Sequence, residues 1–197
     1  PDPVRLREIV YLLALSRVGE RLDRRGIHRL HALGVRLNGR TLALLMPEGG
    51  GKSTLALALL AHTDARILSE DTPLTTRSGR LLPFPLRIGV REGQPLPFPP
   101  AFVRRFERTR HGTKQVLDIA AFADRIAPEG PIDGLLLGVR SSAPEPVITP
   151  LARAAAFPAV AANLVFGLGL PQVVEYFLRG GIPDALGKAS LLASRTA

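Results

Sequence analysis

A glycine-rich stretch at residues 46–54, which reads Met-Pro-Glu-Gly-Gly-Gly-Lys-Ser-Thr, restricts the fold of this chain more than any other feature. Apolar residues 41–45 precede it and predict a buried strand, and residues 53–60 predict a buried helix. Glycines between a strand and a helix let backbone N–H groups turn toward an anion, and the helix start adds a favourable dipole. The stretch therefore predicts a phosphate-binding loop.

Two side chains in this stretch suit a nucleoside triphosphate. Lys52 can reach the β- and γ-phosphates, and the Ser53 hydroxyl can bind Mg²⁺. Met46 stands where the usual pattern has its first glycine. The alternative interpretation is a glycine-rich tight turn with an incidental lysine. The residues predicted to bind the nucleotide are Glu48, Gly49, Gly50, Gly51, Lys52, Ser53 and Thr54.

An acidic pair, Glu70-Asp71, follows the next predicted strand, at residues 65–68. In parallel α/β sheets, catalytic groups gather beyond the carboxyl ends of the strands, where a phosphate-binding loop also lies. We therefore expect Glu70 and Asp71 to provide Mg²⁺ ligands, together with Ser53, and a base for the accepting hydroxyl. The alternative is a turn, because the Asp-Thr-Pro segment that begins at Asp71 also suits one.

A β-hairpin is predicted upstream of the glycine-rich stretch. Residues 28–37 and 41–45 read as two strands, and Asn38-Gly39 between them is the strongest short hairpin signal. The hairpin places His31 beside the strand that leads into the glycine-rich stretch. A histidine on a strand is more often structural or solvated than catalytic, so its position alone assigns it no role.

This order of residues resembles a known family. The order is similar to that in the catalytic domain of HPr kinase/phosphorylase and its smaller relatives. His31 comes first, Gly-Gly-Gly-Lys-Ser-Thr follows at 49–54, and Glu70-Asp71 comes after the next strand. That family shares its P-loop core with phosphoenolpyruvate carboxykinase, so the resemblance implies a mixed β-sheet with a P-loop, flanked by helices. The resemblance covers about residues 27–71 well and the remainder only loosely.

The resemblance also implies roles for individual residues. Lys52 and Ser53 would hold the triphosphate and Mg²⁺, and His31 would lie near the transferred phosphate. Glu70 would occupy the place of the family's catalytic aspartate and activate the accepting hydroxyl, while Asp71 would assist with the metal. We therefore expect an ATP- and Mg²⁺-dependent kinase whose acceptor is a serine of a peptide or small protein.

Two other functions remain open at this stage. A small-molecule kinase or carboxykinase-like enzyme would transfer phosphate to a metabolite, without a peptide. A non-catalytic nucleotide-binding regulatory module would bind ATP without turnover, which the departures at Met46 and Glu70 would suit. No counterpart of the family's later glycine-arginine-asparagine segment is recognisable, so HPr itself is not the acceptor we expect.

Basic side chains beyond the acidic pair are candidate contacts to the acceptor. They lie in a proline-rich segment at residues 83–93 and in a basic loop at residues 108–114. Guanidinium groups match the geometry of phosphates and carboxylates, although ordinary solvated arginines and a mobile surface loop are the alternatives. The candidates are Arg87, Arg91, Arg110 and Lys114.

Length and composition predict one domain, and the predicted strands and helices around the glycine-rich stretch give it the α/β class. The chain has 197 residues and 46% hydrophobic content, enough for one sizeable core. We expect a single domain over residues 1–197. Its expected parts are an N-terminal helix at 1–26, a sheet and P-loop core at 27–150, and C-terminal helices at 151–197.

Charge and cysteine content bear on partners and compartment. The net charge of +9 is spread over scattered arginines, so an anionic nucleotide explains it more simply than nucleic acid or a membrane surface. The chain has no cysteine, which excludes disulfides and agrees with a cytoplasmic location. No apolar run reaches the roughly 18 residues that span a bilayer. The oligomeric state stays open, a homo-oligomer included.

The remaining elements are less regular. A short helix is expected at residues 101–108, and strands at 114–119, 132–139 and 147–151, the second central in the sheet and the third outer. The expected helices near the end are 152–164, interrupted at Pro158, then 172–178 and 183–193.

Overall fold

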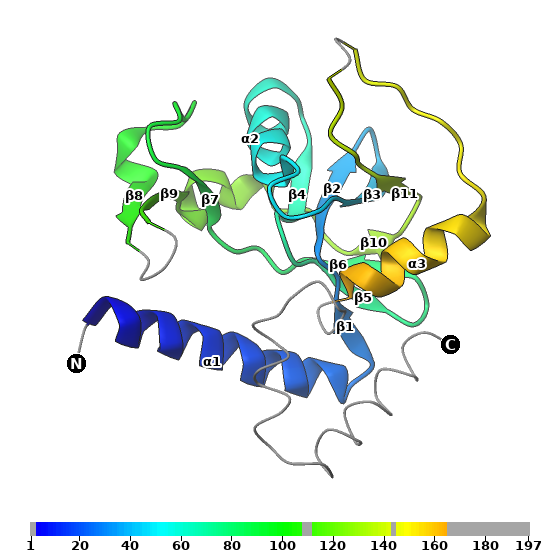
Figure 1. The fold of residues 1–197 in the computed structure, drawn as a ribbon, viewed down its shortest axis with the longest axis horizontal. Helices are drawn as coiled ribbons and strands as arrows, with labels where there is room; N and C mark the ends of the chain where they lie inside the picture. The colour runs from blue at the N-terminus through cyan, green and yellow to red at the C-terminus, as the bar shows by residue number, and fades with distance from the viewer. Residues whose placement is uncertain (1–2, 108–111, 143–144, 165–197) are drawn as a thin grey trace.

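A computed structural model describes residues 3–107, 112–142 and 145–164 of the chain (Figure 1). It shows a mixed α/β protein with three small, mostly antiparallel sheets. None of the helices in these described ranges is both long and apolar enough to cross a membrane.

The central sheet positions the candidate site. Its β2 strand is antiparallel to both β3 and β4, and β11 is parallel to β3. Strands β3, β4 and β11 therefore run in the same direction, and their carboxyl ends lie at the same end of the sheet as the start of β2. In sheet order the strands are β11 (Gly134–Leu137), β3 (Arg40–Leu45), β2 (Ala32–Leu37) and β4 (Arg66–Ser69).

The hairpin between β2 and β3 is confirmed. Leu37 pairs with Arg40, and the two turn residues, Asn38 and Gly39, have φ of 50° and 77°. Positive φ at both positions is the requirement of the tight hairpin turn that Asn-Gly favours.

The prediction of one continuous strand over residues 28–37 is wrong. The chain forms β1 (Ile27–Arg29), which pairs with a different sheet, and then β2. The break falls at residues 30 and 31, where Leu30 bridges to Leu164 and the His31 amide donates to the Asn163 carbonyl at 2.6 Å. Residues 163 and 164, far along the chain, therefore pair with the backbone at the position where a continuous strand would have made its own hydrogen bonds.

Both faces of the central sheet are covered, because its side chains alternate between two apolar clusters. Helix α2 (Lys52–His62) covers one face and α3 (Arg153–Asn163) packs toward the other (Figure 1). Buried residues on the α2 side include Leu33, Val35, Leu44, Ile67, Ala56, Leu57, Leu60 and Phe122. Buried residues on the opposite side include Ala32, Ala43, Leu45, Leu68, Leu81 and Ala127.

Two smaller antiparallel sheets flank the central one. The second sheet is ordered β1, β5 (Leu74–Thr76), β6 (Arg80–Leu82) and β10 (Gly130–Pro131). The third sheet is ordered β7 (Ile88–Arg91), β9 (Lys114–Leu117) and β8 (Val103–Phe106). Helix α1 (Pro3–Asp23) runs along the lower side in Figure 1, and short 3₁₀ helices occupy Pro100–Phe102 and Ile119–Arg125.

Three other predictions for the later elements are corrected. The helix predicted at 101–108 is wrong for most of its length: residues 101–102 end a short 3₁₀ helix, and residues 103–106 pair with β9 as an outer strand. The 132–139 strand is confirmed as β11, but it lies at the edge of the sheet rather than at its centre. Residues 147–151 form no strand.

The C-terminal helices are described only in part. Helix α3 continues through Pro158, because one proline removes a single N–H from the helix ladder and the helix accommodates that loss. The helices predicted at 172–178 and 183–193 lie outside the described residues.

Candidate functional site

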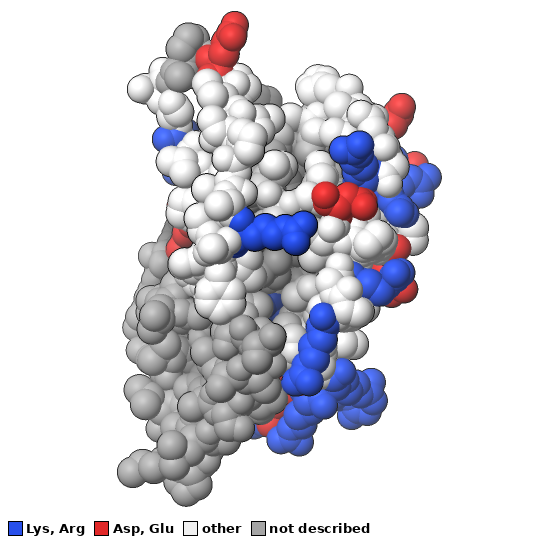
Figure 2. Space-filling model, turned by 90° about the vertical axis from the view of Figure 1, so that its right-hand side faces the viewer, with Lys and Arg blue, Asp and Glu red and all other residues white. Residues whose placement is uncertain are grey.

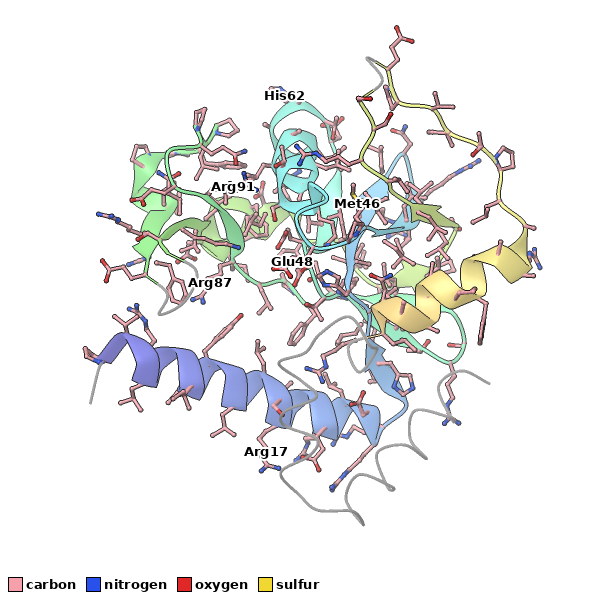
Figure 3. The ribbon with its side chains drawn as sticks, viewed as in Figure 1. Arg17, Met46, Glu48, His62, Arg87 and Arg91 are labelled. Atoms are coloured by element: carbon pink, nitrogen blue, oxygen red, sulfur yellow. The ribbon has the colours of Figure 1, made fainter. Side chains whose placement is uncertain are left out.

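Most of the residues that the sequence singled out lie at one end of the central sheet, where β3, β4 and β11 finish and β2 begins. His31 directly precedes β2, Met46 follows β3, and Glu70 follows β4. The register pairs Ala32 with Leu45, so the residues just beyond these two strand ends are neighbours. The chain from Met46 then crosses to the start of α2, where Lys52 is the first helical residue. Figure 3 labels Met46 and Glu48 near that end of α2.

The backbone of this strand-to-helix connection requires its glycines. Gly49 and Gly51 have φ of 72° and 109°, which L-residues with a side chain rarely adopt. A Cβ on Gly50 would lie 2.9 Å from the Pro47 carbonyl oxygen. No side chain among the described residues caps the start of α2, so its first N–H groups stay available to an anion.

Met46 does not disturb this geometry. Asn38 is the one non-glycine residue of the described chain with positive φ, so the backbone at Met46 does not require a glycine. The Met46 side chain packs against the apolar cluster on the α2 side. It also lies against Gly138, just beyond β11, where a Cβ would come within 2.6 Å of its Cγ. Sequence analysis missed Gly138, since nothing local links it to residue 46.

Lys52 is buried, with 6% of its surface exposed, and is held by the connection itself. Its Nζ lies 2.9 Å from the Met46 carbonyl oxygen and 3.4 Å from the Pro47 carbonyl oxygen. His31 Nε2 lies 2.9 Å from the same Nζ. Burial lowers the pKa of Lys52, and the negative charges of Asp71, Glu70 and Glu48 oppose that shift.

His31 links Lys52 to Asp71. Its Nδ1 lies 3.2 Å from Asp71 Oδ1, and the Ala32 amide donates to the Asp71 carbonyl at 3.1 Å. Burial lowers the pKa of His31 more than Asp71 raises it, which favours the neutral ring. A neutral ring that donates from Nδ1 to Asp71 and accepts from Lys52 at Nε2 satisfies all three side chains.

Glu70 and Ser53 form the other half of the arrangement. The Ser53 hydroxyl donates a short hydrogen bond to Glu70 Oε1. Burial raises the pKa of Glu70 to about 7, a shift that the Ser53 hydrogen bond and the nearby Lys52 and Lys114 moderate while Asp71 adds to it. A carboxylate that titrates near neutrality can both accept and release a proton.

The other predicted site residues divide into near and distant ones. Lys114 lies on β9, close enough for its charge to lower the pKa of Glu70. Glu48, Thr54 and Arg91 are exposed. Arg110 lies outside the described residues.

Arg87 lies outside the cluster around Lys52, between the third sheet and α1 (Figure 3). Its guanidinium stands 4.7 Å from the ring centre of Tyr11 and 4.1 Å from that of Phe106. Neither aromatic residue drew attention in the sequence, because nothing in the local pattern pairs Tyr11 with a residue so far along the chain.

The donor set at the end of β4 suits Mg²⁺. The described residues contain no group of three or more His, Cys, Asp or Glu side chains that could hold a metal by themselves. Mg²⁺ usually keeps several water ligands and takes one or two protein oxygens together with substrate phosphates. The Ser53 hydroxyl and the Glu70 carboxylate, already in contact, meet that smaller requirement.

Comparisons with known proteins add nothing to this geometry. Scans against models of protein families and against curated proteins find no match to this chain. What the arrangement can do is therefore judged from its chemistry: a helix start open to an anion, a buried lysine beside it, and a carboxylate that titrates near neutrality.

Proposed function

We propose that this chain is an ATP- and Mg²⁺-dependent kinase that transfers the γ-phosphoryl group to a hydroxyl, a serine of a peptide or small protein. On this proposal residues 46–54 are a P-loop, and the core is of the HPr kinase and phosphoenolpyruvate carboxykinase type. One observation carries the proposal. Lys52, Ser53, Glu70 and the His31–Asp71 pair converge at the sheet edge where the glycine-rich connection enters α2.

The glycine-rich connection would bind the phosphates. Its backbone N–H groups and the start of α2 favour an anion at this position. Lys52 would exchange its contacts with the Met46 and Pro47 carbonyls for phosphate oxygens, and the His31–Asp71 pair would keep its ammonium group in place. Positioning of this kind and neutralisation of charge account for most of the catalysis in phosphoryl transfer.

Glu70 would act as the base. The accepting serine hydroxyl loses its proton to the Glu70 carboxylate, and its oxygen forms a bond to the γ-phosphorus. The bond from that phosphorus to the bridging oxygen breaks and releases ADP. A carboxylate within reach of the accepting hydroxyl is a group of the kind that takes up such a proton.

Ser53 and Glu70 would hold the metal. When bound, Mg²⁺ supplies charge neutralisation at the β- and γ-phosphates. A carboxylate oxygen and a hydroxyl are hard oxygen donors of the kind that Mg²⁺ prefers. The hydrogen bond between the two side chains holds these oxygens next to each other.

The surface charge agrees with a small anionic ligand. On the face drawn in Figure 2, Lys and Arg side chains occur in separate groups, the largest at the lower end, with uncharged surface and some acidic side chains between them. A basic band along a groove would instead favour a nucleic-acid backbone.

Two substitutions test the proposal. Lys52→Ala should abolish ATP binding measured by calorimetry, because no other described lysine contacts the connection. Glu70→Gln should retain ATP binding and lose transfer of ³²P from γ-labelled ATP to serine peptides. Arg40→Gln, at the exposed first residue of β3, is the control and should change neither.

Each outcome separates the proposal from its rivals. Full transfer activity in Glu70→Gln would show that Glu70 is not the base. Transfer to metabolites in preference to peptides would identify a small-molecule kinase or carboxykinase-like enzyme. Tight ATP binding with no turnover on any acceptor would identify a non-catalytic nucleotide-binding module.

A further inference from the structure

A charged cavity lies between the third sheet and α1. It has a volume of about 250 Å³, and its lining carries four arginines around one aromatic ring. The lining residues are Arg7, Arg87, Arg104, Arg105, Phe106, Val116 and Asp118. No residue of the proposed phosphoryl-transfer site lines it, so it calls for a separate explanation.

Two of the four arginines are neutralised and two are not. Arg104 Nε lies 3.6 Å from Asp118, and Arg105 Nε lies 2.9 Å from Glu92. Arg7 and Arg87 form no ion pair with any described carboxylate. Both stand over the Phe106 ring, with the guanidinium carbon 4.9 Å from the ring centre for Arg7 and 4.1 Å for Arg87. Among the described residues, the arginines of the cavity therefore contribute an excess of two positive charges.

Stacking leaves these two guanidinium groups ready to bind an anion. The ring of Phe106 lies against their faces, and Tyr11 lies against Arg87 as well. A stacked guanidinium keeps its N–H groups free at the edge, where a carboxylate binds through two parallel hydrogen bonds. The aromatic contacts also restrict both side chains before any ligand arrives, which reduces the entropy lost on binding.

Two residues beside the cavity, Lys114 and Tyr11, also interact with carboxylates of the proposed phosphoryl-transfer site. Phe106 pairs in register with Lys114, whose charge acts on Glu70. Arg87 contacts Tyr11, and the pKa of the Tyr11 phenol is raised by burial and by the charge of Asp71 and lowered by Arg87. Lys114 and Tyr11 therefore each interact with a residue of the cavity lining and with a carboxylate that follows β4.

We propose that this cavity, formed around Arg7, Arg87 and Phe106, binds an acidic side chain of the polypeptide that accepts the phosphate. The inference rests on the proposed kinase function for the identity of the ligand. Its volume is below the roughly 300 Å³ at which small-molecule sites begin, so it suits a side chain better than a free nucleotide. Its excess positive charge selects carboxylates over neutral or basic side chains.

The test measures peptide binding by the full chain without ATP. A fluorescein-labelled peptide with a serine next to a run of glutamates is compared, by fluorescence anisotropy, with the same peptide carrying glutamines. The acidic peptide should bind about tenfold more tightly, the size expected from a charge-assisted hydrogen-bonded pair. Arg7→Gln and Arg87→Gln should each remove most of that preference, and Arg87→Lys should restore part of it.

Arg40→Gln is the control variant, because it removes the same charge at the exposed first residue of β3, and it should leave the preference intact. Equal binding of the two peptides, or an unchanged preference in both cavity variants that fold by circular dichroism, would overturn the inference. Stronger binding of a single-stranded oligonucleotide than of the acidic peptide, lost in the same variants, would overturn it too.

The assay also separates this inference from the proposed function. Lys52→Ala should keep the preference for the acidic peptide, because Lys52 does not line the cavity. Selective binding of the acidic peptide with no phosphoryl transfer would support the proposed role of the cavity and contradict the proposed kinase activity. Transfer to serine peptides regardless of their charge would support the kinase activity and contradict the role of the cavity.

Discussion

At the scale of single residues, the candidate site depends on how burial alters ionisation. Burial lowers the pKa of Lys52 and His31 and raises that of Glu70 to about 7. Each shift disfavours the charged form of the group, because burial removes the water that would solvate that charge.

The shift at Glu70 makes stability depend on pH in a defined direction. Between its ordinary value of 4.5 and about 7, Glu70 holds its proton in the folded chain and not in the unfolded one. The free energy of unfolding of the nucleotide-free protein should therefore decrease as pH rises through this window, by up to about 3 kcal/mol from this group. Urea unfolding at a series of pH values measures the change.

Glu70→Gln should remove that part of the pH dependence. Its matched control is Glu107→Gln, an exposed glutamate that should leave the slope unchanged. A slope that is identical in the wild type and in Glu70→Gln would show that the carboxyl ionises normally in the folded chain.

Met46 and Gly138 should be energetically coupled. A Cβ on residue 138 would lie 2.6 Å from Met46 Cγ and 3.0 Å from its Sδ, so Gly138→Ala should destabilise the protein by about 1–3 kcal/mol. In a Met46→Gly background the space is empty, and the same change should cost at least about 1 kcal/mol less. A double-mutant cycle from urea unfolding gives the coupling, and strictly additive effects would mean that the two residues do not touch.

At the scale of elements, the connection between β3 and α2 is built from backbone that glycine alone adopts readily. Gly49 has φ of 72°, and nothing lies within 4 Å of the position a Cβ would take. The turn between β5 and β6 offers a matched case at Gly79, with φ of 73° and the same empty surroundings. The two glycines differ in location and not in local geometry.

Alanine at either position should destabilise the protein equally, but its effect on ATP binding should differ between the two positions. Gly49→Ala and Gly79→Ala should each lower the free energy of unfolding by about 1–2 kcal/mol, the strain of an L-residue with positive φ. Only Gly49→Ala should weaken ATP binding, because the connection must keep its N–H groups aimed at the phosphates. Equal ATP affinity of the two variants by calorimetry would contradict a phosphate-binding role for the connection.

At the scale of the whole molecule, one arginine joins elements that are far apart in the chain. Arg125, in the 3₁₀ helix Ile119–Arg125, donates from Nε to the Ala65 carbonyl at 3.1 Å and from a terminal nitrogen to the Leu60 carbonyl at 3.4 Å. It thereby holds the end of α2 against the start of β4. The two segments that carry Ser53 and Glu70 are thus connected at their far ends as well as in the site.

Arg125→Met should therefore destabilise the fold. It leaves carbonyls at the end of α2 without their donor, which costs about 1–3 kcal/mol. The control is Arg66→Met, an exposed arginine on the neighbouring β4 strand, which should change stability by no more than about 0.5 kcal/mol. Thermal melting followed by circular dichroism compares the two, and equal melting temperatures would contradict the role assigned to Arg125.

Local residue patterns were sufficient to predict the elements around the glycine-rich stretch. Strand β3, helix α2, strand β4 and the Asn38-Gly39 turn follow from apolar periodicity and turn chemistry, which act over a few residues. The P-loop function and the kinase activity remain predictions. Turn chemistry predicts that His31 lies beside the strand before the glycine-rich stretch, and the position of Glu70 after a strand predicts that it shares one end of the sheet with Lys52.

Only the tertiary structure decided the rest. Residues 103–106 form a strand because β9 offers a partner, and β1 separates from β2 because residues near 164 take the hydrogen bonds at the break. The raised pKa of Glu70, the packing of Met46 on Gly138 and the position of Arg87 against Tyr11 depend equally on segments far apart in the chain. Sequence patterns report the conformation of a few neighbouring residues, whereas burial and charge contacts depend on everything that packs around a residue.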